Sequence, residues 1–443
     1  MGGGTMMRNT GDATGDRQAQ QAEAAATPGR RPDWRGRITA SLLTTLLIVV
    51  VAVPLLYVFA PTGEPLTALL PSFPSAGAAP ARTPSPNATP LAMQLRQQAE
   101  VAYVNSLIAH MSLAEEIGQM IMIGFNETQM DPALSYQIEQ DHVGSAIIYA
   151  FNIKSGDQLK QLNSDMQAQA KIPLLIATDQ EGGGVNRLLA VDGPLPSASQ
   201  IGATNDPHYA MQRGQQDAEA LASLGININL APVVDVMNTN GGDLGGRTFG
   251  STPGEVTKMA GAYLHGLQQS GQVIGSLKHF PGLGDVPVDP HQQLYDLNRS
   301  LPDLQNIDWA PYKSLIATGQ VQMVMSTHVV LTAVDATRPA SLSYPVLTGI
   351  LRQKLGFDGV IVTDGIYMKA LSTHYSFDQI ILYAIEAGND IICSTYSIQS
   401  TDEAIAVLRN AVVSGQLPRS RIDDSVRRIL LVKLHLGLLS LPK

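Results

Sequence analysis

The sequence predicts an α/β fold, a (β/α)8 TIM-type barrel, over residues 93–443. Short apolar runs rich in β-forming residues recur about eight times in about 350 residues, which is the size of such a barrel. Helical patterns lie between the runs, and this alternation is typical of a parallel sheet covered by helices. Ionisable residues directly follow several runs. An open doubly wound sheet is the alternative, but no G-x-G-x-x-G follows the first run.

The expected strands and helices can be assigned in chain order. The apolar runs are residues 120–124, 145–149, 173–178, 226–230, 273–277, 323–326, 360–363 and 390–393. Among the helical patterns between and after them are residues 210–224, 255–269 and 377–387.

Three segments precede the expected barrel. Residues 1–37 hold six arginines and four acids among Gly, Gln, Ala and Thr, a composition that predicts a disordered, cytoplasmic tail. Residues 38–60 carry no charge and as a helix would span about 35 Å, enough to cross a bilayer. Residues 61–92 are rich in Pro, Ala, Ser and Thr, which is typical of a semi-extended linker.

The charges beside the apolar segment predict its orientation. Four arginines lie between residues 30 and 37, so the positive-inside rule places the N-terminus in the cytoplasm and the barrel outside the membrane. We therefore expect a single-pass protein of the cell membrane with an extracytoplasmic barrel. A cleavable signal peptide is the first alternative, although the run exceeds the usual apolar region of about 7–15 residues. A buried helix of a soluble protein is the second.

Composition excludes several classes of function. The formal net charge of −9 argues against a nucleic-acid groove, which would show clustered Lys and Arg. The single cysteine, Cys393, excludes an internal disulfide framework and any site built from several cysteines.

Ionisable residues follow four of the expected strands. Asp179, Lys278 with His279, His328 and Asp364 each come directly after an apolar run. Such residues meet at the carboxyl ends of the strands in a barrel, where catalytic groups of barrel enzymes lie. A single Asp in this position is more often a helix N-cap, but four such positions favour a common site.

The stretch from Lys278 to His291 is irregular and rich in Gly and Pro, which favours a functional loop. Asp289 and His291 are two residues apart and would share one face of an extended segment, where the carboxylate can orient the imidazole. Asp364 has no adjacent Lys or Arg and could act as a nucleophile. An incidental surface loop, a metal site of Asp289, His291 and His328, and a Schiff-base enzyme using Lys278 are alternatives. A serine hydrolase is disfavoured because no G-x-S-x-G is present.

Seven motifs together resemble one enzyme family. They are MSLAEEIGQM at 111–120, TDQEGGGVNRL at 178–188, NINLAPVVDV at 227–236, GRTFG at 246–250, SLKHFPGLGD at 276–285, PASLS at 339–343 and LGFDGVIVTDGIYMKAL at 355–371. The combination resembles glycoside hydrolase family 3, in particular its single-domain β-N-acetylglucosaminidase (NagZ-like) branch. The chain departs from the pattern of that branch at Leu283, Pro290 and Gly365.

The resemblance implies an exo-acting, retaining β-glycosidase that removes terminal β-linked N-acetylglucosamine and needs no cofactor or metal. Asp364 would be the nucleophile, and His291 with Asp289 would be the acid/base dyad. Residues that would bind the sugar are Asp179, Arg187, Arg247, Lys278, His279 and His328. The partner would be a carbohydrate, such as a cell-wall glycan. Another β-glycosidase specificity, phosphorolysis on the same site and a degenerate sugar-binding protein are the alternatives.

Overall fold

The computed structural model describes residues 90–237, 244–284, 286 and 291–442. The expected tail (1–37), the expected anchor (38–60) and the linker up to residue 89 lie outside the described residues, as do Asp289 and Pro290. Within the described ranges, no helix is long and apolar enough to cross a membrane.

Eight parallel strands form one sheet in which strands that follow each other along the chain are also neighbours in space. Between the first and last strands of that order an isolated parallel bridge joins Val362 to Ile391, so the ring is nearly closed. The strands are β1 (Ile121–Ile123), β2 (Ser145–Ile148), β3 (Leu175–Thr178), β6 (Ile228–Asn229), β7 (Ile274–Phe280), β9 (Met323–Ser326), β11 (Val360–Thr363) and β12 (Ile392–Thr395). Each of the eight expected runs overlaps one of them, and the α/β barrel is confirmed.

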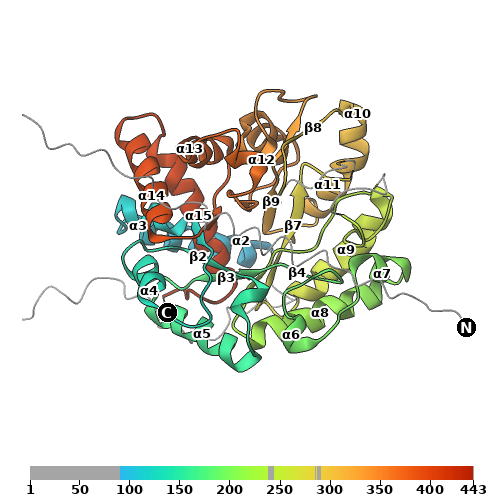
Figure 1. Ribbon diagram of the computed structural model, residues 1–443, viewed down its shortest axis with the longest axis horizontal. Coiled ribbons are helices and arrows are strands. Elements are labelled where there is room, and N and C mark those ends of the chain that lie inside the picture. The colour runs from blue at the N-terminus through green and yellow to red at the C-terminus, as the bar shows by residue number, and fades with distance from the viewer. Residues whose placement is uncertain (1–89, 238–243, 285, 287–290, 443) are drawn as a thin grey trace, which may run out of the picture.

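Helices surround the strands (Figure 1). The longer ones are α4 (Pro132–Glu139), α5 (Gly156–Gln169), α8 (Pro207–Ser223), α9 (Pro253–Gln268), α11 (Ala310–Ile316), the π-helix η5 (Pro345–Lys354), α13 (Phe377–Ala387) and α14 (Ile398–Val413). Helix α3 (Leu113–Gln119) precedes the first strand, and α2 (Pro90–Ile108) packs against α15 (Arg419–His435).

Short elements lie in the loops between strands and helices. They are η2 (Ala150–Asn152), the hairpin β4 (Gln180–Gly182) and β5 (Val185–Asn186), α6 (Leu189–Asp192), α7 (Ala198–Ala203), β8 (Tyr295–Leu297), α10 (Leu301–Asp303), the π-helix η3 (Leu304–Asp308), β10 (Val329–Leu331), η4 (Ala340–Leu342) and α12 (Lys369–Ser372). β8 and β10 pair in parallel beside the barrel.

Local sequence signals explain where several helices begin. In α9, Thr252 accepts a hydrogen bond from the backbone N–H of Glu255, and the Glu255 side chain accepts one from the backbone N–H of Thr252. Ser376 and Gln379 make the same capping box at α13. Each cap satisfies backbone donors that the first turn leaves free, so these helices begin at fixed residues.

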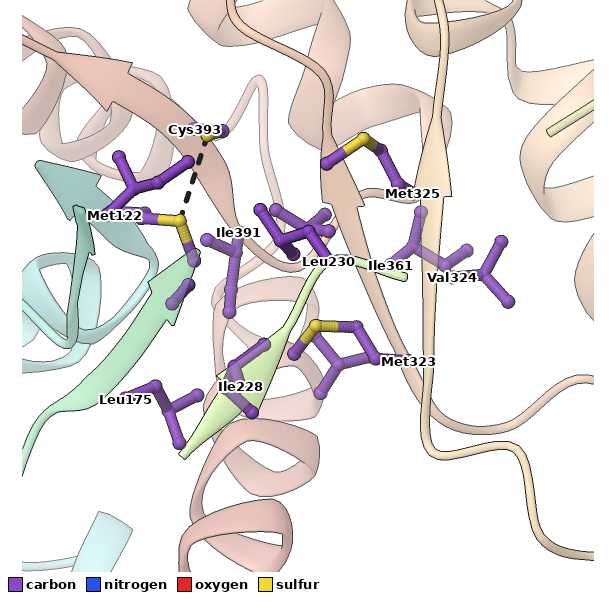
Figure 2. Close-up of a cluster of buried hydrophobic side chains, with 14 of the residues drawn as sticks. Met122, Leu175, Ile228, Leu230, Met323, Val324, Met325, Ile361, Ile391 and Cys393 are labelled. Atoms are coloured by element: carbon purple, nitrogen blue, oxygen red, sulfur yellow. Dashed lines mark hydrogen bonds between the residues drawn. The ribbon is translucent and has the colours of Figure 1, made fainter. Parts of the chain in front are cut away.

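Sulfur-containing side chains fill much of the barrel interior. Met122, Met323, Met325 and Cys393 lie with branched aliphatic side chains between the strands (Figure 2), and each is at most 3% exposed. The Sγ of Cys393 lies 3.7 Å from the Sδ of Met122. Unbranched methionine side chains adapt to an irregular interior, which suits the tapered space within a barrel.

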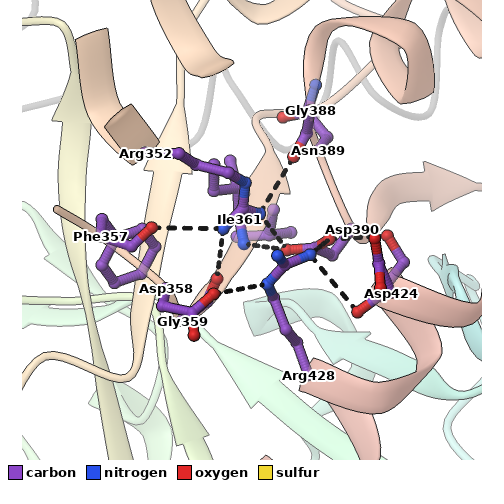
Figure 3. Close-up of polar contacts among 12 residues, drawn as sticks. Arg352, Phe357, Asp358, Gly359, Ile361, Gly388, Asn389, Asp390, Asp424 and Arg428 are labelled. Atoms are coloured by element: carbon purple, nitrogen blue, oxygen red, sulfur yellow. Dashed lines mark hydrogen bonds and ion pairs between the residues drawn. The ribbon is translucent and has the colours of Figure 1, made fainter. Parts of the chain in front are cut away.

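A buried carboxylate joins the two strands at the seam of the ring. Oδ2 of Asp390 accepts hydrogen bonds from the backbone N–H of Ile361 at 2.9 Å and from Nη2 of Arg352 at 2.6 Å. Its Oδ1 accepts from Oγ of Ser425 at 2.6 Å and from Nη1 of Arg428 at 3.3 Å (Figure 3). Asp390 therefore connects β11 to the start of β12, where a full ladder is absent.

Candidate active site

The expected site residues lie at one end of the barrel. Asp179 follows β3, Lys278 and His279 lie within the last three residues of β7, His328 comes two residues after β9, and Asp364 directly follows β11. All of these strands are parallel, so their carboxyl ends point the same way. The convergence expected from the sequence is therefore present.

Buried ion pairs connect four of the charged residues. Nζ of Lys278 lies 2.5 Å from Oδ1 of Asp179 and 2.6 Å from Oε1 of Glu181. Arg247 holds the same glutamate with two bonds, Nε to Oε2 at 2.8 Å and Nη2 to Oε1 at 2.9 Å. The Lys278 side chain is only 2% exposed, so the charges of this network must balance within the protein.

The network keeps its members ionised. Burial alone would raise the pKa of Glu181, but the charges of Arg247 and Lys278 outweigh it and hold that pKa far below its usual value. Burial alone would lower the pKa of Lys278, but the carboxylates of Asp179 and Glu181 outweigh it and raise that pKa. The site therefore presents fixed charges and strong hydrogen-bond donors and acceptors.

Asp235 fixes the orientation of His279. Its Oδ2 lies 2.8 Å from Nδ1 of His279, and its Oδ1 accepts from the backbone N–H of Leu283 at 2.8 Å. Nε2 of His279 lies 3.3 Å from Nη2 of Arg247. Because a guanidinium only donates, this contact assigns the His279 proton to Nδ1, with Asp235 as its acceptor.

Asp364 is partly exposed and has a different environment from the other carboxylates. Its Oδ1 accepts from the backbone N–H of Gly365 at 2.8 Å. Burial alone would raise its pKa, but His328, His279 and His291 and that backbone N–H together lower it. Among the ion pairs within the described ranges none includes Asp364, so its charge is not neutralised by an arginine or lysine.

The structure places the other two expected histidines differently. The His328 side chain is fully buried, with Nδ1 2.8 Å from Oγ of Ser341 and Nε2 3.1 Å from the carbonyl oxygen of Gly365. His291 is half-buried, and its carbonyl oxygen accepts from the backbone N–H of Lys369 at 3.3 Å. Asp289, the expected partner of His291, lies outside the described residues.

Aromatic side chains follow three of the strands at the same end of the barrel. The guanidinium carbon of Arg187 is 5.8 Å from the centre of the Tyr149 ring. The Tyr149 and Tyr396 rings stack with centroids 6.3 Å apart, and Tyr367 meets Tyr396 edge to face at 5.2 Å. These tyrosines follow three different strands, so nothing in the local sequence identifies them as a group.

The sequence interpretation also missed Glu181 and Asp235. Both stand inside motifs quoted for the family resemblance, TDQEGGG and NINLAPVVDV, and that position was their only signal. Within the part of the chain that the structure describes, no group of three or more His, Cys, Asp or Glu side chains could hold a metal ion.

A parallel barrel with a partly exposed carboxylate, imidazoles and buried ion pairs at the carboxyl ends of its strands has the architecture of the barrel enzymes. Residues 112–432 match the family described as "Glycosyl hydrolase family 3 N terminal domain". The chain belongs to glycosyl hydrolase family 3.

Relatives of known name support this assignment. The chain is 31% identical over 336 residues to beta-hexosaminidase A of Pseudoalteromonas piscicida, which covers 70% of this chain and 56% of that protein. It is 32% identical over 361 residues to beta-hexosaminidase LpqI of Mycobacterium tuberculosis, which covers 78% of this chain and 88% of that protein. The chain thus spans little more than half of the first relative and most of the second.

Solved structures show the same fold. A family 3 beta-N-acetylglucosaminidase from Paenibacillus sp. str. FPU-7 superposes with a TM-score of 0.72 at 35% identity, covering 74% of this chain and 63% of that one. M. tuberculosis LpqI superposes with a TM-score of 0.68 at 30% identity, covering 74% of this chain and 96% of that one.

Proposed function

We propose that this protein is an exo-acting, retaining β-glycosidase that hydrolyses terminal β-linked N-acetylglucosamine. The observation that carries the proposal is Asp364, an ionised, partly exposed carboxylate at the carboxyl end of β11 in a family 3 barrel, with no Lys or Arg paired to it among the described residues. The names of its relatives, beta-hexosaminidase and beta-N-acetylglucosaminidase, support the choice of sugar.

The proposed reaction has two steps. In the first, an oxygen of Asp364 bonds to the anomeric carbon while the bond to the leaving oxygen breaks, and His291 protonates that oxygen. In the second, His291 takes a proton from water, the water oxygen bonds to the anomeric carbon, and Asp364 is released with net retention of configuration. Asp289 would orient the imidazole of His291, as a carboxylate does in other catalytic groups that contain histidine.

The ion-pair network is suited to hold the sugar. Asp179, Arg247 and Lys278 present charged donors and acceptors in fixed positions, and such groups make strong, directional hydrogen bonds to hydroxyls. Arg187 and His279 complete the proposed set around the terminal sugar. Because these side chains are already ordered by their ion pairs, binding requires little further ordering.

We also propose how the chain is organised and where it acts. Residues 1–37 would be a cytoplasmic tail, 38–60 a membrane anchor, 61–92 a linker and 93–443 the catalytic barrel outside the membrane. The uncharged run and the preceding arginines support this topology. Protease added to intact cells should then release a fragment of about 39 kDa, the mass expected from the average residue in roughly 350 residues. Protection of the barrel until lysis would contradict the topology.

Substitution of the nucleophile tests the activity. Asp364→Asn keeps the shape of the side chain but removes the attacking charge, so kcat on aryl β-N-acetylglucosaminides should fall by several orders of magnitude. Asp378→Asn, at an exposed position in the first turn of α13, is the matched control and should retain wild-type turnover. An Asp364→Asn variant that kept a tenth of the wild-type rate would disprove the covalent mechanism.

Substitution of His291 tests the acid/base assignment. His291→Ala should slow hydrolysis of unactivated glycosides much more than that of dinitrophenyl glycosides, because good leaving groups need little protonation. Azide, which needs no base, should restore the rate and give a glycosyl azide of retained configuration. Equal losses on all leaving groups without an azide product would exclude His291 as the acid/base. Formation of a sugar phosphate in phosphate buffer would indicate a phosphorylase instead, and sugar binding without turnover a degenerate site.

A further inference from the structure

His328 has no free ring nitrogen to offer a sugar. Its side chain is fully buried, and both nitrogens lie within hydrogen-bond distance of protein atoms: Nδ1 is 2.8 Å from Oγ of Ser341, and Nε2 is 3.1 Å from the carbonyl oxygen of Gly365. Gly365 directly follows Asp364. His328 therefore contacts the backbone of the residue that follows the proposed nucleophile.

The contact with Gly365 assigns one ring proton of His328. A carbonyl oxygen only accepts, so Nε2 carries the proton and donates it to Gly365. Burial lowers the pKa of His328, against the opposing influence of the Asp364 charge and of the Gly365 carbonyl, while nearby His291 lowers it further. The hydroxyl of Ser341, 2.8 Å from Nδ1, holds the opposite side of the ring.

Ser341 is itself held in place. It belongs to η4 and is fully buried, and its backbone N–H donates to the carbonyl oxygen of Thr327 at 3.1 Å. Its own carbonyl oxygen accepts from Nδ2 of Asn389 at 2.8 Å. These bonds tie η4 to the end of β9, and so they fix the hydroxyl that orients the His328 ring.

The backbone after Asp364 is clamped by this arrangement. The peptide group between Gly365 and Ile366 is held on both sides, its carbonyl by His328 and its N–H by the carbonyl oxygen of Cys393 at 3.2 Å. The backbone N–H of Asp364 donates to Ser326 at 2.8 Å. The peptide group between Asp364 and Gly365 lies between these two fixed groups. Its N–H, which belongs to Gly365, points at Oδ1 of Asp364, 2.8 Å away.

We propose that His328, oriented by Ser341, is a positioning residue that holds Asp364 in its attacking geometry through the carbonyl of Gly365, and does not bind the sugar. The inference rests on the proposed function, because it assigns His328 a part in the same covalent step. A displacement of about 1 Å in a reacting group costs on the order of a hundredfold in rate, so loss of this clamp has a measurable consequence.

The test uses the full-length protein and dinitrophenyl β-N-acetylglucosaminide, whose first step needs the nucleophile but little acid. Ser341→Ala and His328→Ala should lower kcat by roughly ten- to a hundredfold. The acid limb of the kcat/KM profile should move to higher pH, because Asp364 loses an aligned N–H donor. His328→Gln, whose amide can still donate to Gly365, should recover much of the rate.

Sugar affinity separates positioning from binding. Calorimetric titration with N-acetylglucosamine should give dissociation constants within about twofold of wild type for all these variants, because none of them removes a sugar contact. Ser343→Ala is the matched control, a buried serine two residues from Ser341 whose Oγ donates to Asp335 at 2.7 Å and not to His328. It should leave kcat and the pH profile unchanged.

Two results would overturn the inference. A tenfold loss of sugar affinity with unchanged kcat would make His328 a sugar ligand, and unchanged kcat, pH profile and affinity would remove it from the mechanism. If His328→Ala fails to fold, Ser341→Ala and His328→Gln carry the same test. Failure of the proposed function is seen separately, because wild-type protein would then release no sugar from any β-glycoside.

Discussion

A buried lysine makes the stability of the barrel depend on pH. Lys433 of α15 is fully buried, and its Nζ lies 2.6 Å from Oε1 of Gln119, an uncharged partner. Burial lowers the pKa of its amine from 10.5 to about 7. The folded protein therefore holds this lysine in its neutral form over a range of pH in which the unfolded chain holds it charged.

The direction of the effect follows from proton binding. Between pH 7 and 10.5 the unfolded state binds more protons at this residue, so the free energy of unfolding rises with pH in that window. Below about pH 7 the folded protein must protonate a buried amine, and the penalty is complete. A difference of about 3.5 pKa units at about 1.4 kcal/mol each gives a penalty of about 5 kcal/mol.

Lys433→Met removes the charge and keeps the length of the side chain. It leaves Oε1 of Gln119 without its donor, which costs about 1 kcal/mol at every pH. We therefore expect the variant to be about 4 kcal/mol more stable than wild type at pH 6.5 and about 1 kcal/mol less stable above pH 10.5. Urea unfolding of the two proteins, followed by circular dichroism at a series of pH values, measures this difference directly.

The comparison between variant and wild type isolates Lys433 from other groups that titrate near neutrality, since both proteins contain them. Lys160→Met, at an exposed position of α5, is the matched control and should follow the wild-type curve. A stability difference between Lys433→Met and wild type that stayed constant from pH 6.5 to 10.5 would refute the reasoning, because ionisation of Lys433 would then not affect folding.

Three further predictions follow from the other carboxylates. Asp390→Ala should lower the free energy of unfolding by about 3–5 kcal/mol, measured by urea unfolding, because it removes the buried carboxylate that the half-buried Arg352 and Arg428 share. Burial and the charge of Asp402 raise the pKa of Asp141 to about 7, so wild-type stability should fall as pH rises from about 4 to 7. Asp402→Asn should reduce that fall, and an unchanged pH dependence would exclude the pair. Asp235→Asn should raise KM roughly tenfold, because it weakens the acceptor that orients His279, a proposed sugar ligand; an unchanged KM in steady-state assays would contradict this.

Most of the fold is visible in the sequence because barrel strands are buried on both faces and read as apolar runs. The strand boundaries are less visible. The run 273–277 becomes β7 from Ile274 to Phe280, because its pairing with β9 shifts register between Leu277 and Phe280. Lys278 and His279, expected just after the strand, therefore lie within it. A register shift depends on the neighbouring strand and leaves no local signal.

The candidate site could also be predicted only in part from the sequence. Residues that follow strands converge because the fold requires it, and Asp179 and Lys278 do form an ion pair. The partners that fix them are distant in sequence. Glu181 and Arg247 are 66 residues apart and Asp235 and His279 are 44 apart, so no spacing rule joins them. His328 shows a second limit: the family resemblance assigns it to the sugar, and no local sequence signal predicts that Ser341 and Gly365 lie against its two ring nitrogens.

Two carboxylates of this barrel, buried Asp390 and partly exposed Asp364, differ in their partners. Burial alone would raise the pKa of Asp390, but the arginines around it outweigh that effect and lower it. Both oxygens of Asp390 are held in ion pairs with these arginines, at the seam between β11 and β12. An attack by such a carboxylate would first have to break its ion pairs, at a cost of several kcal/mol. Asp364 is kept ionised by imidazoles and one backbone N–H instead. These partners stabilise its charge and leave its side chain partly exposed, as the proposed attack on carbon requires. In this barrel, the partners of a carboxylate therefore separate the structural role of Asp390 from the role that we propose for Asp364.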